Sequence, residues 1–205
     1  MITLGSIGGC VMRIMCSVSN LPLLLCVFLL DISVVGHVVA SDYARVKSDG
    51  GQVRMEMSDG AFRGLSLPSN VTSVIYDKER HQVKGDSYIS LFQVSPSNVG
   101  EPAGVCGAGS EVWLYVYKEV GLALDESARV LVSSCLRSIS LASQNSGKEN
   151  QDFDFSSVQW SDQGFLIEWF QQTATSGQPL SSTSYLLDNG VFLRHDVLRE
   201  ESQHE

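Results

Sequence analysis

The sequence predicts an all-β fold: a single antiparallel β domain, arranged as a sandwich or a barrel-like meander, after an N-terminal signal peptide. Short runs rich in β-branched and aromatic residues recur along the chain, and apolar and polar side chains alternate in several of them. Gly, Asn, Asp and Pro separate these runs at short intervals. Asn189-Gly190, between two apolar runs, strongly indicates a β-hairpin because both residues tolerate a positive φ.

Residues 1–40 have the features of an export signal. Arg13 provides a basic flank, residues 21–30 form an uncharged apolar run, and residues 38–40 offer a small-residue cleavage site before Ser41. An uncleaved membrane anchor is the alternative, since about 20 apolar residues span a bilayer. Asp31 interrupts the apolar stretch and favours the signal peptide. We therefore expect residues 41–205 to form an exported domain, either periplasmic or secreted.

The first expected strands of this domain are short. Residues 52–57 alternate apolar and polar side chains, and residues 58–60 turn the chain before Phe62 opens the next strand. Residues 71–76 and 88–94 are further runs of β-branched and aromatic residues. We expect all of them in one antiparallel arrangement.

Residues 112–117 (V-W-L-Y-V-Y) are apolar on both faces. This pattern predicts a central strand that is covered on both sides. We expect residues 129–141 to be its antiparallel partner, joined to it through a loop over residues 121–128.

The last third of the chain predicts an antiparallel meander. Its expected strands cover residues 158–160, 165–170, 184–187 and 191–197. Residues 143–152 are polar and rich in Gly, Asn and Gln, so we expect a mobile loop there, with a second loop tip at 174–179. The charged tail 199–205 is expected to fray.

The cysteines fit an oxidising compartment. Cys10, Cys16 and Cys26 lie in the signal, which leaves Cys106 and Cys135 as one predicted disulfide. A hairpin turning at 121–128 would place Cys135 near Leu114 rather than near Cys106. The glycine-rich segment before Glu111 must therefore fold back over the sheet.

The charge balance limits the partners. The chain carries 23 acidic and 14 basic residues, a formal charge of −9. This argues against a nucleic-acid binder and against electrostatic attachment to anionic lipid, so we expect no nucleic acid and no membrane contact after signal cleavage. A protein partner with a basic surface is the interpretation that acidity favours. No motif predicts a cofactor.

Three groups of residues invite a catalytic interpretation, and each has a plainer one. Cys106, in G-V-C-G-A-G, lacks the preceding strand and following helix of a nucleophile elbow. His81 is expected in solvent, and His195 and Asp196 point to opposite faces of one strand, so neither histidine joins a zinc or catalytic set. Glu168 alternates with apolar residues and could serve as an acid, but a solvent-facing role is the more ordinary one.

The function we expect is that of an exported, non-enzymatic protein that binds a protein partner. A periplasmic inhibitor or immunity protein is the specific version. A structural or accessory envelope component is the alternative, followed by a small carbohydrate-active hydrolase. The residues expected in the partner-binding loops are Asn98, Glu101, Asn145, Lys148, Glu149, Asp152 and Gln178.

Overall fold

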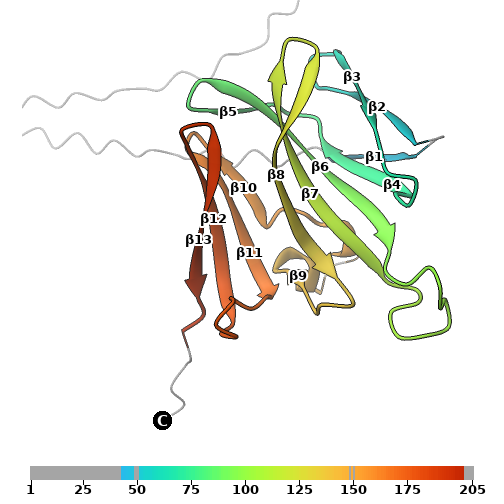
Figure 1. Ribbon diagram of the computed structural model, residues 1–205. Helices are drawn as coiled ribbons and strands as arrows, with labels where there is room; N and C mark the ends of the chain where they lie inside the picture. Colours follow the sequence, from blue (N-terminus) through green and yellow to red (C-terminus); the bar gives the residue numbers. More distant parts are fainter. Residues whose placement is uncertain (1–42, 49–50, 148, 150, 201–205) are drawn as a thin grey trace, which may run out of the picture. The chain divides into compact units, whose positions relative to one another are not determined.

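The computed structural model describes residues 43–48, 51–147, 149 and 151–200, and they form an almost purely β structure (Figure 1). The predicted signal peptide lies outside these residues. Within the described ranges no helix has the length and apolar character that a membrane span needs. The elements are β1 (Tyr43–Lys47), β2 (Gln52–Glu56), β3 (Phe62–Ser66), β4 (Ser73–Asp77), β5 (His81–Val83), β6 (Asp86–Pro96), β7 (Ser110–Val120), β8 (Ala123–Ser134), β9 (Ser140–Leu141), the 3₁₀ turns η1 (Ser143–Asn145) and η2 (Gln151–Phe153), β10 (Val158–Ser161), β11 (Gly164–Gln171), β12 (Leu180–Asp188) and β13 (Val191–Leu198).

Two antiparallel sheets pack face to face, so the all-β antiparallel prediction is confirmed and the arrangement is a sandwich. The first sheet has the order β1-β4-β6-β7-β8, with β5 paired to β6. The second has the order β10-β11-β12-β13, with β9 paired to β11. At one edge the backbone N–H of Lys84 donates to the carbonyl of Asp162 over 3.0 Å, which joins the two sheets.

The core lies between the sheets. Phe92, Leu114 and Val132 of the first sheet meet Ile167 and Leu180 of the second, and all five are fully buried. Burying a side chain of this size contributes about 1.5–3 kcal/mol to the free energy of unfolding. The apolar side chains of the alternating sequence pattern are therefore the ones that fill the core.

The hairpin of β2 and β3 covers part of the outer face of the first sheet. Met55 packs there against Ile89 and Leu91 in a second apolar cluster. The Tyr76 hydroxyl on β4 accepts a hydrogen bond from the Glu56 N–H over 3.0 Å and donates to the Glu56 carbonyl over 3.2 Å. The hairpin is thus attached by apolar contact and by one buried phenol.

Strand β7 is central, as predicted, because it lies between β6 and β8. Its inward residues Leu114 and Val116 are fully buried. The prediction of complete cover was wrong on the outer face, where Trp113 and Tyr115 are only half-buried. The Arg129 guanidinium lies 5.6 Å from the centroid of the Tyr115 ring.

The β7–β8 hairpin turns earlier than predicted. Val120 pairs with Ala123, so the turn is confined to residues 121–122 and β8 runs through most of the expected loop. Because β8 is an edge strand, it tolerates the polar residues that suggested a loop. In this register Glu111 lies opposite Ser134, which brings Cys135 to the start of β7.

Short edge elements were the ones that the sequence pattern missed. β1 and β5 carry no clear alternation, whereas β3 opens at Phe62 as expected. The long strand predicted over 129–141 is interrupted after Ser134, because Ser138 adopts a φ of 53° in a tight turn before β9. The C-terminal meander β10–β13 contains all four predicted strands, although β12 begins at Leu180, four residues earlier than expected.

Candidate functional site

Four loops gather at one end of the sandwich, which we call the loop end (Figure 1). They are residues 97–109 between β6 and β7, 135–139 between β8 and β9, 142–157 between β9 and β10, and 172–179 between β11 and β12. The antiparallel order of the strands accounts for the first, second and fourth of these connections, and the segment between β9 and β10 reaches them through Gln144 and Asp152, which line a cavity with Gly109 and Cys135. The predicted partner-binding residues all belong to these four segments.

The predicted disulfide is present and organises this end. Cys106 in the first loop is bonded to Cys135, which follows β8, with a Cα–Cα distance of 5.7 Å. The segment before Glu111 folds back to reach it, as the sequence required. A Cβ atom on Gly107 would overlap the Pro102 carbonyl, so the close approach of the folded-back loop demands glycine there.

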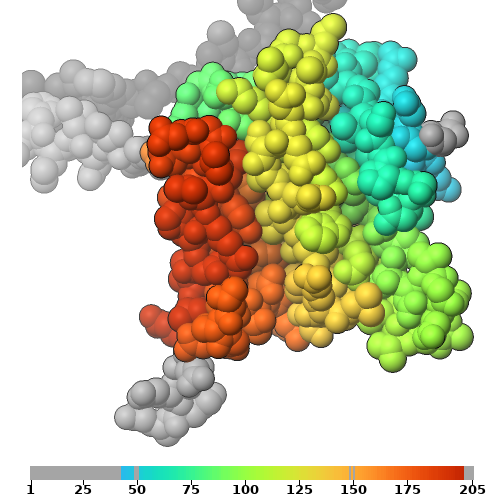
Figure 2. Space-filling view, viewed as in Figure 1, coloured from blue at the N-terminus to red at the C-terminus, as the bar shows by residue number. Residues whose placement is uncertain are grey.

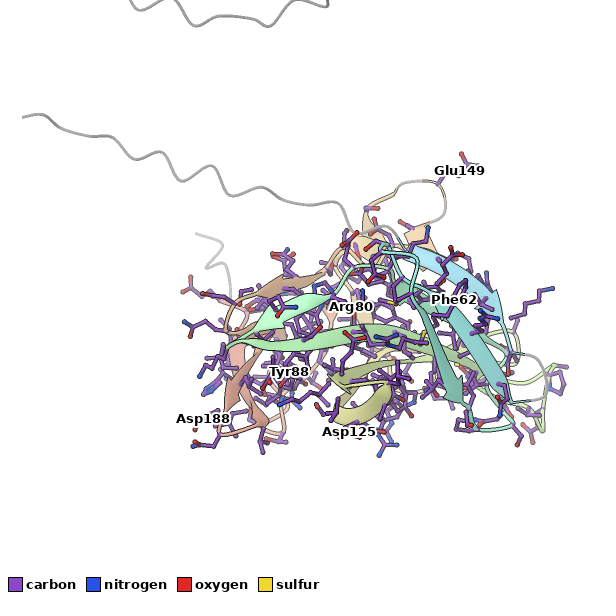
Figure 3. The ribbon with its side chains drawn as sticks, turned by 90° about the horizontal axis from the view of Figure 1, so that it is seen from above. Phe62, Arg80, Tyr88, Asp125, Glu149 and Asp188 are labelled. Carbon is purple, nitrogen blue, oxygen red and sulfur yellow. A yellow bond between two sulfur atoms is a disulfide. The ribbon has the colours of Figure 1, made fainter. Side chains whose placement is uncertain are left out.

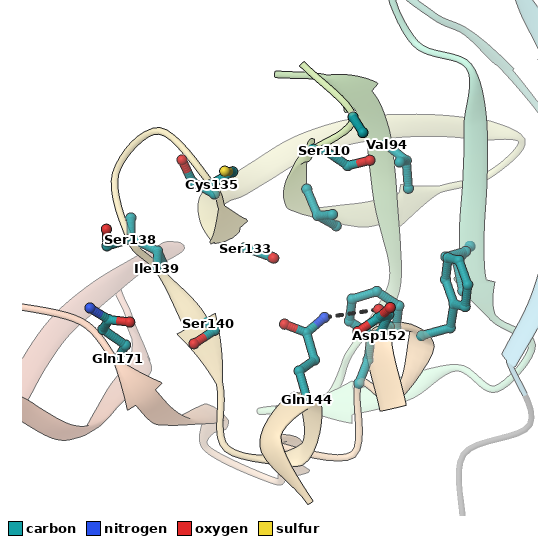
Figure 4. Close-up of a pocket in the computed structure, with 17 residues that line it drawn as sticks. Val94, Ser110, Ser133, Cys135, Ser138, Ile139, Ser140, Gln144, Asp152 and Gln171 are labelled. Carbon is teal, nitrogen blue, oxygen red and sulfur yellow. Dashed lines mark hydrogen bonds between the residues drawn. The ribbon is translucent and has the colours of Figure 1, made fainter. Parts of the chain in front are cut away.

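A cavity of about 590 Å³ opens beside the disulfide (Figure 4). Its volume falls in the range of ordinary ligand sites. Its lining residues are Ile75, Val94, Ala108, Gly109, Ser110, Val112, Ser133, Ser134, Cys135, Ser138, Ile139, Ser140, Gln144, Asp152, Phe153, Phe155 and Gln171.

Small side chains at the ends of β7 and β8 explain why space remains here. Ser110 and Ser133 occupy positions near the loop end, whereas Leu114 and Val132 fill the gap between the sheets farther in. A serine occupies much less volume than a leucine or valine, so the two sheets close over apolar side chains in the middle and leave a cavity at the end.

The wall of the cavity is mixed, with aliphatic and aromatic side chains beside serines and glutamines. Serine hydroxyls and glutamine amides can donate and accept hydrogen bonds. Gln144 Nε2 donates to the Asp152 carbonyl over 3.2 Å, which ties η1 to η2 (Figure 4). Asp152 is the one carboxylate among the lining residues. The Arg45 guanidinium already lies 4.6 Å from the centroid of the Phe153 ring, so this ring accepts a cation.

The structure brings some of the predicted contact residues together and separates others. Asp152 lines the cavity, and Asn145 and Gln178 are exposed on neighbouring loops. Glu149 is exposed and points away from both sheets (Figure 3), and Lys148 lies outside the described residues.

Asn98 and Glu101 belong to the disulfide-bonded loop and differ in role. Asn98 holds the loop internally, since its Nδ2 donates to the Val105 carbonyl over 3.3 Å and its Oδ1 accepts from the Glu101 N–H over 3.1 Å. The Glu101 residue is exposed. Of the two, Glu101 is therefore the one available to a partner.

The residues weighed for catalysis do not assemble around the cavity. Cys106 is bonded to Cys135 and holds no free thiol. Glu168 is exposed on β11, where its Oε2 accepts from Gln159 Nε2 over 3.2 Å, and His195 is exposed on β13; neither lines the cavity. The described residues contain no group of three or more His, Cys, Asp or Glu placed to hold a metal ion.

His81 is not in solvent, contrary to expectation. Its side chain is only 13% exposed, and its Nε2 lies 3.0 Å from Oδ2 of the fully buried Asp77. The imidazole stacks on the Trp160 indole with a centroid distance of 4.2 Å and an interplanar angle of 2°. Asp77 ends β4 and His81 begins β5, so the turn between the two strands brings the pair together. Trp160 joins them from the other sheet, and sequence spacing could not reveal it.

A second buried charge cluster lies away from the loop end. The Glu119 carboxylate on β7 accepts from Arg63 Nε at 2.8 Å, Arg80 Nε at 2.7 Å and Ser87 Oγ at 2.9 Å; Arg80 is labelled in Figure 3. Burial opposes the charged form of Glu119, but the hydrogen bonds from Arg80, Ser87 and Arg63 outweigh it and lower the pKa of the carboxyl. This network links the β2–β3 hairpin to the first sheet.

Comparison with protein families, with curated proteins and with solved structures finds no match to this chain. The function therefore has to be argued from the loop end itself.

Proposed function

We propose that this protein is an exported binding protein that holds a protein partner at the loop end, with a basic side chain of the partner inserted in the cavity. The observation that carries the proposal is the position of the cavity. It opens among the four loops and beside a disulfide that ties two of them to the rigid strands. A surface that is held in one geometry before contact loses little conformational entropy when a partner binds.

Charge supports a basic partner. The four loops contain the acidic residues Glu101, Glu149, Asp152 and Asp154, against Arg137 and Lys148. Complementary charge of this kind steers association and selects among partners.

The cavity suits the side chain of a lysine or an arginine. Asp152 offers a carboxylate and the serines offer hydroxyl acceptors. Phe153, which is 48% exposed, offers apolar surface for the aliphatic stem of the side chain. The contact between Arg45 and the Phe153 ring is an example, within the chain, of the interaction proposed.

Export is the second part of the proposal. The disulfide between Cys106 and Cys135 is compatible with an oxidising compartment. In the periplasm the specific version is an inhibitor or immunity protein, whose partner is a toxin or a hydrolase. The partner's own activity, measured with and without this protein, distinguishes an inhibitor from a scaffold component of the envelope.

The experiment is a capture from envelope extract of the source organism, with the full oxidised chain as bait, at low and at physiological salt. We expect a stoichiometric partner that survives physiological salt. Ser133→Phe fills the cavity and should weaken capture by roughly tenfold or more, and Asp152→Asn should weaken it less and reduce its salt dependence. Asp125→Asn is the matched control, since it removes the same charge from the exposed part of β8.

Capture by Ser133→Phe at the wild-type level, with the variant folded by near-ultraviolet circular dichroism, would show that the cavity is not the site. An empty capture with the wild-type chain at both salt concentrations would overturn the proposed function as a whole.

A further inference from the structure

Strand β13 is an exposed edge of the second sheet. Among the described strands it pairs with β12 alone, and its residues apart from Phe192 are exposed. It lies on the face seen in Figure 2, beside β8. An edge strand presents unpaired N–H and C=O groups and is therefore a template for pairing with another chain.

The residues whose backbone groups face the free edge follow from the hairpin. Asp188 and Val191 close the Asn189-Gly190 turn as an opposed pair. The Leu187 N–H donates to the Gln163 carbonyl, in the turn between β10 and β11, and therefore points away from β13. Leu187 and Phe192, which lie opposite each other on β12 and β13, are thus a non-hydrogen-bonded pair. Because hydrogen-bonded and non-hydrogen-bonded pairs alternate, the N–H and C=O groups of residues 192, 194 and 196 point to the open edge.

The side chains of β13 are self-complementary in one antiparallel register. Within one chain Arg194 Nε already donates to Asp196 Oδ1 over 2.7 Å. With His195 opposite His195 of a second copy, Arg194 also lies opposite the second copy's Asp196, and Leu193 lies opposite Val197, each twice by symmetry. The two ion pairs of the separate chains then join as a cluster of four alternating charges. In this register the outward backbone groups of residues 194 and 196 form a hydrogen-bonded pair, as an antiparallel ladder requires.

The two neighbouring registers place like charges opposite each other. A shift that still pairs the outward backbone groups with one another moves the two-fold axis onto residue 194 or 196. Arg194 then lies opposite Arg194, or Asp196 opposite Asp196, and like charges directly opposed are unfavourable. Of these three registers the charge pattern favours the one centred on His195.

An apolar stripe on the sheet surface also favours a second copy of the chain as the partner of β13. Leu193 is 44% and Val197 is 51% exposed, and Leu186 of β12, paired with Leu193, is 39% exposed. The two-fold register places Leu193 of each copy against Val197 of the other and continues this stripe across both sheets. We propose that the protein forms a symmetric dimer through antiparallel pairing of β13 with β13 of a second copy. This inference does not depend on the proposed partner site at the loop end.

A cysteine placed on the two-fold axis tests the register. The full chain with Cys10, Cys16 and Cys26 replaced by serine keeps the native disulfide and serves as the parent. His195→Cys brings two thiols into a non-hydrogen-bonded pair with Cα atoms about 4.5 Å apart, within disulfide reach. We expect it to give a covalent dimer under mild oxidation. Leu193→Cys is the matched control and should give little, because in the dimer Leu193 faces Val197.

Charge exchange tests the interface without new cysteines. Arg194→Asp and Asp196→Arg each create opposed like charges and should weaken dimerisation, measured by sedimentation equilibrium, by roughly tenfold or more. The double variant restores both opposite-charge pairs and should restore the dimer. Circular dichroism of each variant checks the fold. A wild-type chain that remains monomeric up to its solubility limit, or equal cross-linking at residues 193 and 195, would overturn the proposal.

Discussion

Replacing both bonded cysteines by alanine tests how the loop end is held together. Cys106 and Cys135 are separated by 29 residues, and a cross-link over a loop of that length removes conformational entropy from the unfolded chain worth about 3.5 kcal/mol at 25 °C. We therefore expect the free energy of unfolding to fall by about 3–4 kcal/mol in Cys106→Ala/Cys135→Ala. The comparison chain carries serine at Cys10, Cys16 and Cys26 in both forms, so that the bonded pair is the only difference.

The backbone at Cys106 provides an internal control. Its φ is 59°, a conformation that costs a residue with a Cβ about 1–2 kcal/mol and glycine almost nothing. If the loop keeps its shape without the bond, Cys106→Gly/Cys135→Ala should be more stable than the double alanine variant by about 1 kcal/mol. Equal stability would mean that the loop relaxes once the bond is gone.

Equilibrium unfolding in urea, followed by tryptophan fluorescence, measures both differences. The slope of unfolding free energy against urea should increase in the variants, because an unfolded chain without the cross-link exposes more surface. A loss below about 1 kcal/mol for the double alanine variant, with an unchanged slope, would refute the argument that the bond acts through the unfolded chain.

Three further predictions concern the rest of the fold. Because the pKa of Glu119 is lowered in the folded protein, the carboxylate stabilises the fold fully at any pH above 4.5, its pKa in the unfolded chain, and this stabilisation is lost as the pH falls through the folded pKa. Glu119→Gln should therefore cost about 2–4 kcal/mol at pH 7. Urea titrations at several pH values should show the difference between the variant and the wild-type chain shrinking toward pH 3. Gly164→Ala places a Cβ against the Tyr185 carbonyl at a φ of 153° and should lower the free energy of unfolding, measured by thermal unfolding, by about 2–4 kcal/mol. In the control Gly100→Ala the new Cβ meets no other atom, so the free energy of unfolding should change by less than about 0.5 kcal/mol. Tyr76→Phe removes both hydrogen bonds to β2 and should cost about 1–2 kcal/mol, with faster amide exchange in the β2–β3 hairpin than in the second sheet; unchanged exchange would contradict the attachment described.

Local patterns predicted the parts of the fold that depend on neighbouring residues. Asn189-Gly190 specified its hairpin because the turn needs a positive φ at both positions, which are 47° and 83°. The turn at residues 121–122 was missed because the polar residues after it resemble a loop, although they continue along an edge strand. The disulfide partners were predicted by elimination, whereas the register that brings them together was not.

Features built from distant segments could not be read in advance. The cavity exists because small residues on β7, β8 and β9 face one another across two sheets, and no single run shows that. His81 was expected in solvent because its own segment is charged. Its burial depends on Trp160, which is distant in the chain and packs against it from the second sheet.

The division of the sheets along the chain has a consequence for how the protein is made. The first sheet pairs only residues between 43 and 134, and the second only residues between 140 and 198. The N-terminal sheet can therefore complete its hydrogen bonding while the last third of the chain is still being synthesised. Until that part arrives, Phe92, Leu114 and Val132 have no opposing layer. We therefore expect a chain terminated before β10 to expose this apolar face and to aggregate more readily than the full chain.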